Sequence, residues 1–99
     1  MKVEGRCHCG AISYEAEVDP GTASICHCLD CQMLTGSAFR ANVQAPAATF
    51  QILTGTPRRY TKVAESGAKR VHAFCENCGS PIYSCAPDSP LKRFKITGL

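Results

Sequence analysis

Tryptophan is absent from this chain of 99 residues, and aromatic residues make up only 7% of it. No apolar run approaches the length of a membrane-spanning helix, which is about 20 residues. Such a chain builds only a small hydrophobic core and lies near the lower end of what folds unaided. The opening residues, Met-Lys-Val-Glu-Gly, lack the apolar segment of a secretory leader. We therefore expect a single domain, residues 1–99, that is cytoplasmic and has no membrane partner.

Cysteine, in contrast, is abundant, and its positions are the most informative feature of the chain. Seven of the eight cysteines fall into three tight clusters, and only Cys85 stands apart. Thiols two or three residues apart have the spacing of zinc-binding knuckles, and in two clusters a following glycine lets the backbone fold under a metal. The three clusters are Cys7-His8-Cys9-Gly10, Cys26-His27-Cys28-Leu29-Asp30-Cys31 and Cys75-Glu76-Asn77-Cys78-Gly79.

A disulfide framework is the main alternative use of these cysteines. Eight cysteines can pair in about 105 ways, as they do in small secreted domains. However, a disulfide between thiols two residues apart, such as Cys7 and Cys9, is strained, whereas a shared metal ion is not. Because the opening residues do not resemble a leader, we also expect the chain to stay outside the oxidising compartments where disulfides persist. The pattern therefore favours metal binding over disulfides.

The number of thiols in each cluster predicts two zinc sites of different kinds. A structural zinc is closed by four protein ligands, and a catalytic zinc keeps one position open for water or substrate. The two clusters that contribute two cysteines each together complete one closed site. The cluster with three cysteines leaves a second site one ligand short. We therefore expect two Zn²⁺ ions as cofactors.

The charge of the chain does not favour nucleic acid as a partner. The formal net charge is +3, with 11 basic and 8 acidic residues. Seven metal-bound thiolates and two Zn²⁺ ions would bring that charge close to zero. The basic residues form short clusters without a run of five, which is typical of solvated strand faces.

The pattern of apolar residues predicts a mainly β fold with one short helix. Residues 11–18 alternate, with Ile12, Tyr14, Ala16 and Val18 expected on the buried face. Residues 37–44 also alternate, and there we expect Phe39, Ala41 and Val43 to be buried and Arg40, Asn42 and Gln44 exposed. Residues 93–97 continue the pattern. Only residues 29–35, directly after the middle cluster, are predicted to form a helix.

The three clusters together resemble a known family. The segments that carry the resemblance, in this order, are Gly5-Arg6-Cys7-His8-Cys9-Gly10-Ala11-Ile12-Ser13-Tyr14, Cys26-His27-Cys28-Leu29-Asp30-Cys31 and Phe74-Cys75-Glu76-Asn77-Cys78-Gly79-Ser80-Pro81-Ile82. They are similar to the signature of the glutathione-dependent formaldehyde-activating family, which also includes centromere protein V. The resemblance covers residues 5–98 and implies the β-tent fold, in which antiparallel sheets are held by zinc.

The resemblance also implies which cysteines hold which metal, and what the protein does. It implies a structural zinc on Cys7, Cys9, Cys75 and Cys78, and a second, catalytic zinc on Cys26, Cys28 and Cys31. The implied activity is the condensation of formaldehyde with glutathione to S-hydroxymethylglutathione, which in reverse is a carbon–sulfur lyase reaction. The implied partner is a small-molecule thiol such as glutathione. The family continues beyond the position of Leu99, so we expect the family's C-terminal segment to be missing from the domain.

A non-catalytic zinc scaffold that binds a protein or nucleic acid remains the alternative function. Three thiolates donate strongly to zinc and weaken it as a Lewis acid, which would suit a structural second site. The absence of a basic extension at either end of the sequence favours the enzyme.

Five further residues are candidates for minor roles. We expect His8 and His27 to lie beside their clusters without binding metal, because neighbouring side chains in an extended chain point in opposite directions. Asp30 could accept a proton near the open site. Cys85 is expected to be a buried apolar side chain, and His72 to be structural.

Overall fold

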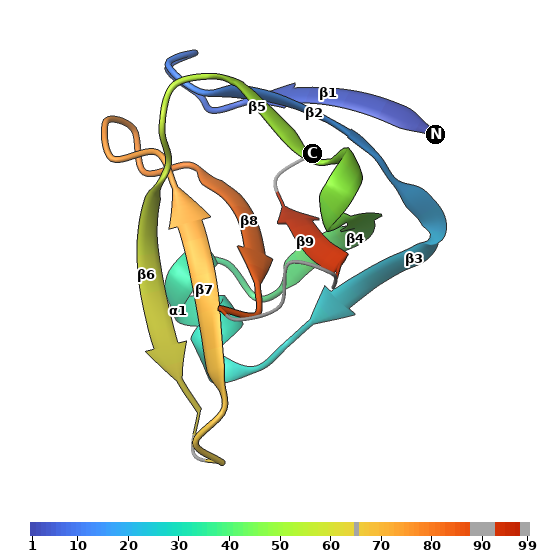
Figure 1. The fold of residues 1–99 in the computed structure, drawn as a ribbon. Coiled ribbons are helices and arrows are strands. Elements are labelled where there is room, and N and C mark those ends of the chain that lie inside the picture. The colour runs from blue at the N-terminus through green and yellow to red at the C-terminus, as the bar shows by residue number, and fades with distance from the viewer. Residues whose placement is uncertain (65, 88–92, 98–99) are drawn as a thin grey trace.

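The computed structural model describes residues 1–64, 66–87 and 93–97 and confirms the predicted mainly β fold with a short helix (Figure 1). In chain order, the elements are β1 (Lys2–Arg6), β2 (Ser13–Glu17), β3 (Asp19–Cys26), α1 (Leu29–Thr35), β4 (Arg40–Pro46), the 3₁₀ turn η1 (Ala47–Thr49), β5 (Gln51–Thr54), β6 (Arg58–Val63), β7 (Lys69–Phe74), β8 (Pro81–Cys85) and β9 (Arg93–Thr97). Among the described residues, no helix is long and apolar enough to cross a membrane.

The described strands form two antiparallel sheets. The smaller sheet has the order β1-β2-β5, and the larger has the order β3-β4-β9-β8-β7-β6. Strand β9 lies between β4 and β8, so the larger sheet joins early and late parts of the chain. In Figure 1 the smaller sheet runs across the top, and β6 and β7 lie side by side on the left, opposite β3 on the right.

The core lies between the two sheets. Ile12, Tyr14, Ala16 and Val18 are all at most 5% exposed, which confirms the buried face predicted for residues 11–18. The Tyr14 ring stacks on Phe50 at a centroid distance of 5.2 Å, and Phe50 in turn contacts Tyr83 of the larger sheet. Aromatic contacts of this kind stabilise the fold beyond simple burial.

The burial predicted for residues 39–42 is wrong, although Val43 packs against the core as expected. Arg40 and Asn42 are buried, at 5% and 9% exposure, whereas Phe39 is 43% exposed and Ala41 is also exposed. The cause is that this end of β4 faces a polar cavity and not the apolar core. Apolar alternation marks the buried face only where that face packs against apolar atoms.

Helix α1 spans the residues predicted for it. The Cys28 Sγ atom caps its start by accepting a hydrogen bond from the Cys31 amide at 3.4 Å, and Gly36 ends it in the left-handed conformation, with φ of 67°. Glycine adopts this conformation without steric cost. The helix therefore begins inside the middle cysteine cluster and fixes the spacing of that cluster.

We predict that Gly5→Ala destabilises the protein by about 1–3 kcal/mol, the range for inserting a methyl group into a packed site. Gly5 pairs directly with Tyr14, and a Cβ atom at Gly5 would collide with the Tyr14 ring. Urea unfolding measures the change. Glu4→Ala, at the neighbouring exposed position, is the control. Equal stability of the two variants would contradict the packing described here.

Candidate metal centres and the adjoining cavity

Two turns that are far apart in the sequence meet where the sheets approach each other. Residues 7–12 connect β1 to β2, and residues 75–80 connect β7 to β8. Each turn closes with a hydrogen bond from its glycine amide to its first cysteine, at 3.1 Å in the first turn and 2.7 Å in the second. Both glycines have positive φ, 82° and 79°. The chain thus builds two similar thiol-bearing turns that face each other.

The facing turns bring Cys7, Cys9, Cys75 and Cys78 together, with all four Sγ atoms within 4.8 Å of one another. The Cys7 and Cys9 sulfurs are 3.5 Å apart, and those of Cys9 and Cys75 are 3.7 Å apart. A tetrahedral zinc with bonds of about 2.3 Å requires sulfurs about 3.8 Å apart. The thiols therefore fit a four-coordinate zinc, and we call them the four-thiol group.

Neighbouring donors favour the thiolate form of Cys7 and Cys78 in this group. Backbone amides also donate to Cys75, but burial and the neighbouring thiols outweigh them and raise its pKa to about 11. The Ser80 hydroxyl lies 3.2 Å from Cys78 Sγ and, with nearby amides, lowers the pKa of that thiol to about 5. The Ile12 amide donates to Cys7 Sγ at 3.3 Å. Because a metal binds the thiolate, a thiol that is already ionised binds without competition from a proton.

A second group consists of Cys26, Cys28 and Cys31, whose sulfurs also lie within 4.8 Å of one another. We call it the three-thiol group. Cys26 ends β3 and Cys28 caps α1, and their sulfurs are 3.4 Å apart. The hydrogen bond from the Cys31 amide lowers the pKa of Cys28 to about 7, whereas burial raises the pKa of Cys31 to about 12. In the described part of the chain, no fourth Cys, His, Asp or Glu joins this group.

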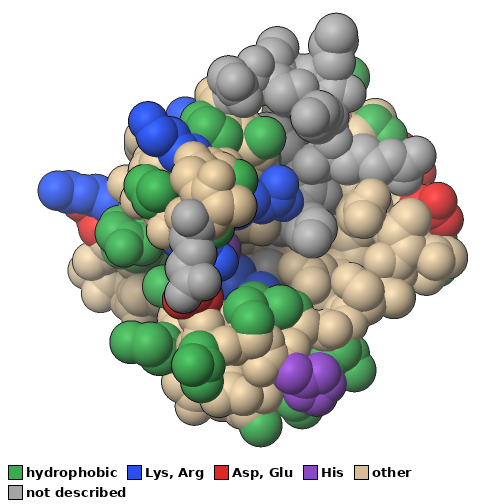
Figure 2. Space-filling model, turned by 90° about the horizontal axis from the view of Figure 1, so that it is seen from below, with side chains coloured by type: hydrophobic (Ala, Val, Ile, Leu, Met, Phe, Trp, Pro, Cys, Tyr) green, Lys and Arg blue, Asp and Glu red, His purple; other side chains and the backbone are tan. Residues whose placement is uncertain are grey.

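The three-thiol group opens onto a cavity of about 370 Å³ under the larger sheet. All three cysteines lie on its wall, and no carboxylate does among the described residues. Figure 2 shows the hollow from below, with blue basic side chains around it. The polar side chains in its wall are Arg40, Asn42, Lys62, Lys69, Arg70, His72 and Ser84.

Strand register explains why these polar side chains share one face. Lys62 pairs with Arg70, and His72 pairs with Ser84, so the four side chains stand in adjacent rows of β6, β7 and β8. Arg40 reaches His72 from β4, with the Arg40 Nη1 and His72 Nδ1 atoms 3.5 Å apart. Burial, together with the nearby Arg40, Lys62 and Arg70 charges, lowers the pKa of His72 to about 4.

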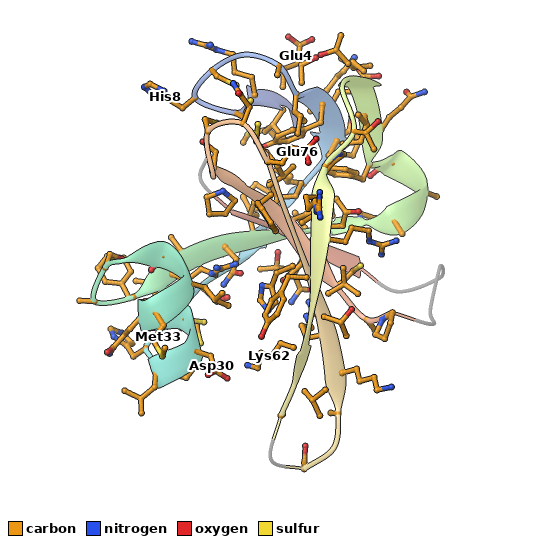
Figure 3. The ribbon with its side chains drawn as sticks, turned by 90° about the vertical axis from the view of Figure 1, so that its left-hand side faces the viewer. Glu4, His8, Asp30, Met33, Lys62 and Glu76 are labelled. Carbon is orange, nitrogen blue, oxygen red and sulfur yellow. The ribbon has the colours of Figure 1, made fainter. Side chains whose placement is uncertain are left out.

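The residues that were expected to have minor roles lie in different parts of the structure. His8 and His27 are exposed and join neither thiol group, and the His27 ring lies beside Phe39. Asp30 forms an ion pair with Lys62 at 2.7 Å, and Figure 3 shows the two side chains pointing toward one another from α1 and β6. Cys85 is buried, at 4% exposure, as predicted.

Sequence reasoning missed the basic wall of the cavity. It placed Arg40 on an exposed face and gave His72 a structural role, whereas both line the cavity. One signal was present in the sequence: the polar residues Arg70 and His72 alternate along β7 with the apolar Val71 and Ala73. Such a pattern also describes an ordinary solvated strand face, so it could not identify a cavity without the fold.

Comparison with known proteins identifies the family. The family model for the glutathione-dependent formaldehyde-activating enzyme matches residues 2–97. The chain belongs to this family. The match includes both thiol groups and all of the described strands. The resemblance recognised from the three cysteine clusters is thereby confirmed.

Two relatives add detail to this assignment. A Schizosaccharomyces pombe protein named as an uncharacterized lyase is 34% identical over 82 residues, which cover 81% of this chain and 55% of that protein. The chain thus spans about half the length of this curated relative. A crystal structure of a Rhodobacter sphaeroides protein has a TM-score of 0.71 at 22% identity, over 95% of this chain and 83% of that one. The second similarity shows a shared fold.

We propose that the four-thiol group holds a structural zinc and the three-thiol group a second zinc, and the two should respond differently to the loss of a thiol. Cys75→Ser should unfold the protein, because losing a ligand of a structural zinc removes folding free energy on the order of several kcal/mol. Cys28→Ser should keep the fold and release one zinc. Thermal unfolding and zinc content measure both effects. Equal loss of stability in the two variants would contradict the assignment.

A pH dependence follows from His72. Its pKa is lowered to about 4 in the folded protein from an ordinary value of 6.5, so the unfolded chain binds the proton more readily. The contribution of His72 to the free energy of unfolding is therefore fully present above about pH 6.5. It is lost as the pH falls from about 6.5 to 4. Melting temperatures of the zinc-loaded protein should fall more between pH 7 and pH 5 than those of His72→Gln. Parallel curves would refute this role.

Proposed function

We propose that this protein is a zinc-dependent lyase that acts on carbon–sulfur bonds at the three-thiol group. Its proposed substrate is S-hydroxymethylglutathione or a related adduct of a thiol and an aldehyde. One observation carries the proposal: the two thiol groups differ. The four-thiol group supplies a complete set of zinc ligands, while the three-thiol group is one ligand short and opens onto a cavity.

The reaction is balanced without an oxidant or a reductant. In the lyase direction the carbon–sulfur bond breaks, its electron pair stays on sulfur, and the hydroxyl oxygen of the adduct becomes the aldehyde carbonyl as its proton passes to water. Zinc bound at the three-thiol group would supply positive charge that stabilises the departing thiolate. The chain's own task is to hold the adduct with its sulfur beside Cys26, Cys28 and Cys31.

Orientation is the main contribution required of the cavity. Thiols already add to formaldehyde readily in water, so the protein gains most by holding the two reactants in one geometry. The cavity volume of about 370 Å³ lies within the range of pockets for small ligands. Its basic wall also suits a peptide thiol that carries carboxylates. These features support glutathione over a neutral thiol.

A zinc scaffold that binds another protein is the second candidate, and the exposed surface of α1 favours it. Leu29 and Met33 are 75% and 80% exposed, and Figure 3 shows Met33 on the helix near Asp30. Exposed apolar side chains that lie together often mark binding surfaces. This candidate gives the cavity no role, and it predicts no response of the metal to thiols.

Cobalt substitution tests the proposed function. In the Co²⁺-loaded protein, glutathione should change the visible absorption by adding a sulfur ligand, and the effect should grow with pH as the thiol loses its proton. S-Methylglutathione should have little effect because its thioether cannot form a thiolate. Cys85→Ser, which removes a buried thiol outside both groups, is the matched control and should respond like the native protein. A spectrum unchanged by excess glutathione would favour the scaffold.

A further inference from the structure

Arg40 is a buried cation without an acidic partner. Its side chain is 5% exposed, and no ion pair among the described residues includes it. Its one described hydrogen-bond partner is the neutral ring of His72, at 3.5 Å. Burying a charge without a partner of opposite sign is costly. Arg40 is therefore poorly explained as a residue that stabilises the fold.

His72 adds a second unused donor at the same place. Its Nδ1 atom faces the Arg40 guanidinium, which can only donate, so Nδ1 accepts and the ring proton lies on Nε2. His72 Nε2 and Arg40 Nε are both buried, and neither has a hydrogen-bond partner among the described residues. Two N–H groups, one on β4 and one on β7, thus lack an acceptor. Both residues lie on the wall of the cavity.

Two other cations of the cavity differ in whether a carboxylate balances their charge. Lys62 is paired with Asp30 at 2.7 Å. Arg70 donates from Nη2 only to the oxygens of Ser84, at 3.4 Å, and burial lowers its pKa. Arg70 is half-buried and has no described carboxylate partner. The charge of the wall is therefore positive and only partly balanced.

Arg58, by comparison, has the carboxylate partner that Arg40 lacks among the described residues. Arg58 forms a 3.0 Å ion pair with Glu76 on the exposed surface, where the pairing needs no ligand. Arg40 is more deeply buried than Arg58, yet it has no carboxylate. Proteins retain such uncompensated groups at sites where function outweighs stability. The acceptor that Arg40 and His72 lack would then be part of a ligand.

We infer that Arg40, His72 and Arg70 form a subsite that binds a carboxylate of the substrate, in the same cavity as the three-thiol group. This inference rests on the proposed function and assigns the residues that position the acidic end of its substrate. Arg40 and Arg70 supply the charge, and the Arg40 Nε–H and His72 Nε2–H groups supply hydrogen bonds. These residues position the substrate, so that its sulfur lies beside the thiols while its carboxylate lies against Arg40.

The subsite is tested with a probe that has no sulfur: the glutathione analogue in which alanine replaces cysteine. Calorimetry with zinc-loaded protein should detect binding of this analogue and much weaker binding of its dimethyl ester, which has no carboxylate. Arg40→Met should weaken binding of the acid by about tenfold to a hundredfold, the loss typical of a charged hydrogen bond. Arg58→Met, which removes an arginine outside the cavity, should change it by less than about twofold.

Stability separates this role from a structural one. Because Arg40→Met removes a buried charge without a partner, its melting temperature should equal or exceed that of the native protein. Arg70→Met is a second variant, and it should also weaken binding of the acid. Equal binding of acid and ester, or a lower melting temperature of Arg40→Met with unchanged affinity, would overturn the inference. Because the probe has no thiol, failure of the cobalt experiment would reject the lyase proposal without affecting this result.

Discussion

The convergence of two cysteine turns on one group of four thiols is the constraint on which the rest of the structure depends. Cys9 and Cys75 are 66 residues apart in the sequence, and their sulfurs are 3.7 Å apart. A cross-link that closes a loop of this length lowers the conformational entropy of the unfolded chain. In the chain-entropy model, this stabilises the folded state by about 4 kcal/mol. In a small domain with few aromatic side chains, a metal bound at this place would supply folding free energy that the small hydrophobic core does not.

This constraint also positions the cavity. The turn at residues 75–80 joins β7 to β8. Strand β7 carries Arg70 beside Lys62 of β6 and His72 beside Ser84 of β8. Strand β4 carries Arg40 to the same place, directly after α1 and the three-thiol group. A single curved sheet therefore supports apolar packing on one side and a basic, thiol-bearing cavity on the other.

The sequence predicted the features that depend on local spacing. Cysteine intervals indicated metal binding, alternation at Ile12 to Val18 indicated a buried strand face, and the helix after Cys28 was located at its true bounds. It failed where burial depends on what lies opposite a strand. Arg40 looked exposed because a charged residue usually is, and only the approach of β7 gives it a buried environment. The residues of the cavity wall could therefore be identified only from the fold, whereas the thiol groups could be predicted from the sequence.

The central claim is that the two thiol groups hold zinc in different ways, one closed and one open. X-ray absorption at the zinc edge of the native protein measures this most directly. Our account predicts two zinc ions per chain with a mean of about 3.5 sulfur ligands each at about 2.3 Å, rising toward four when glutathione is added. Two zinc ions that already have four sulfur ligands each, unchanged by glutathione, would contradict the account, as would a single zinc per chain.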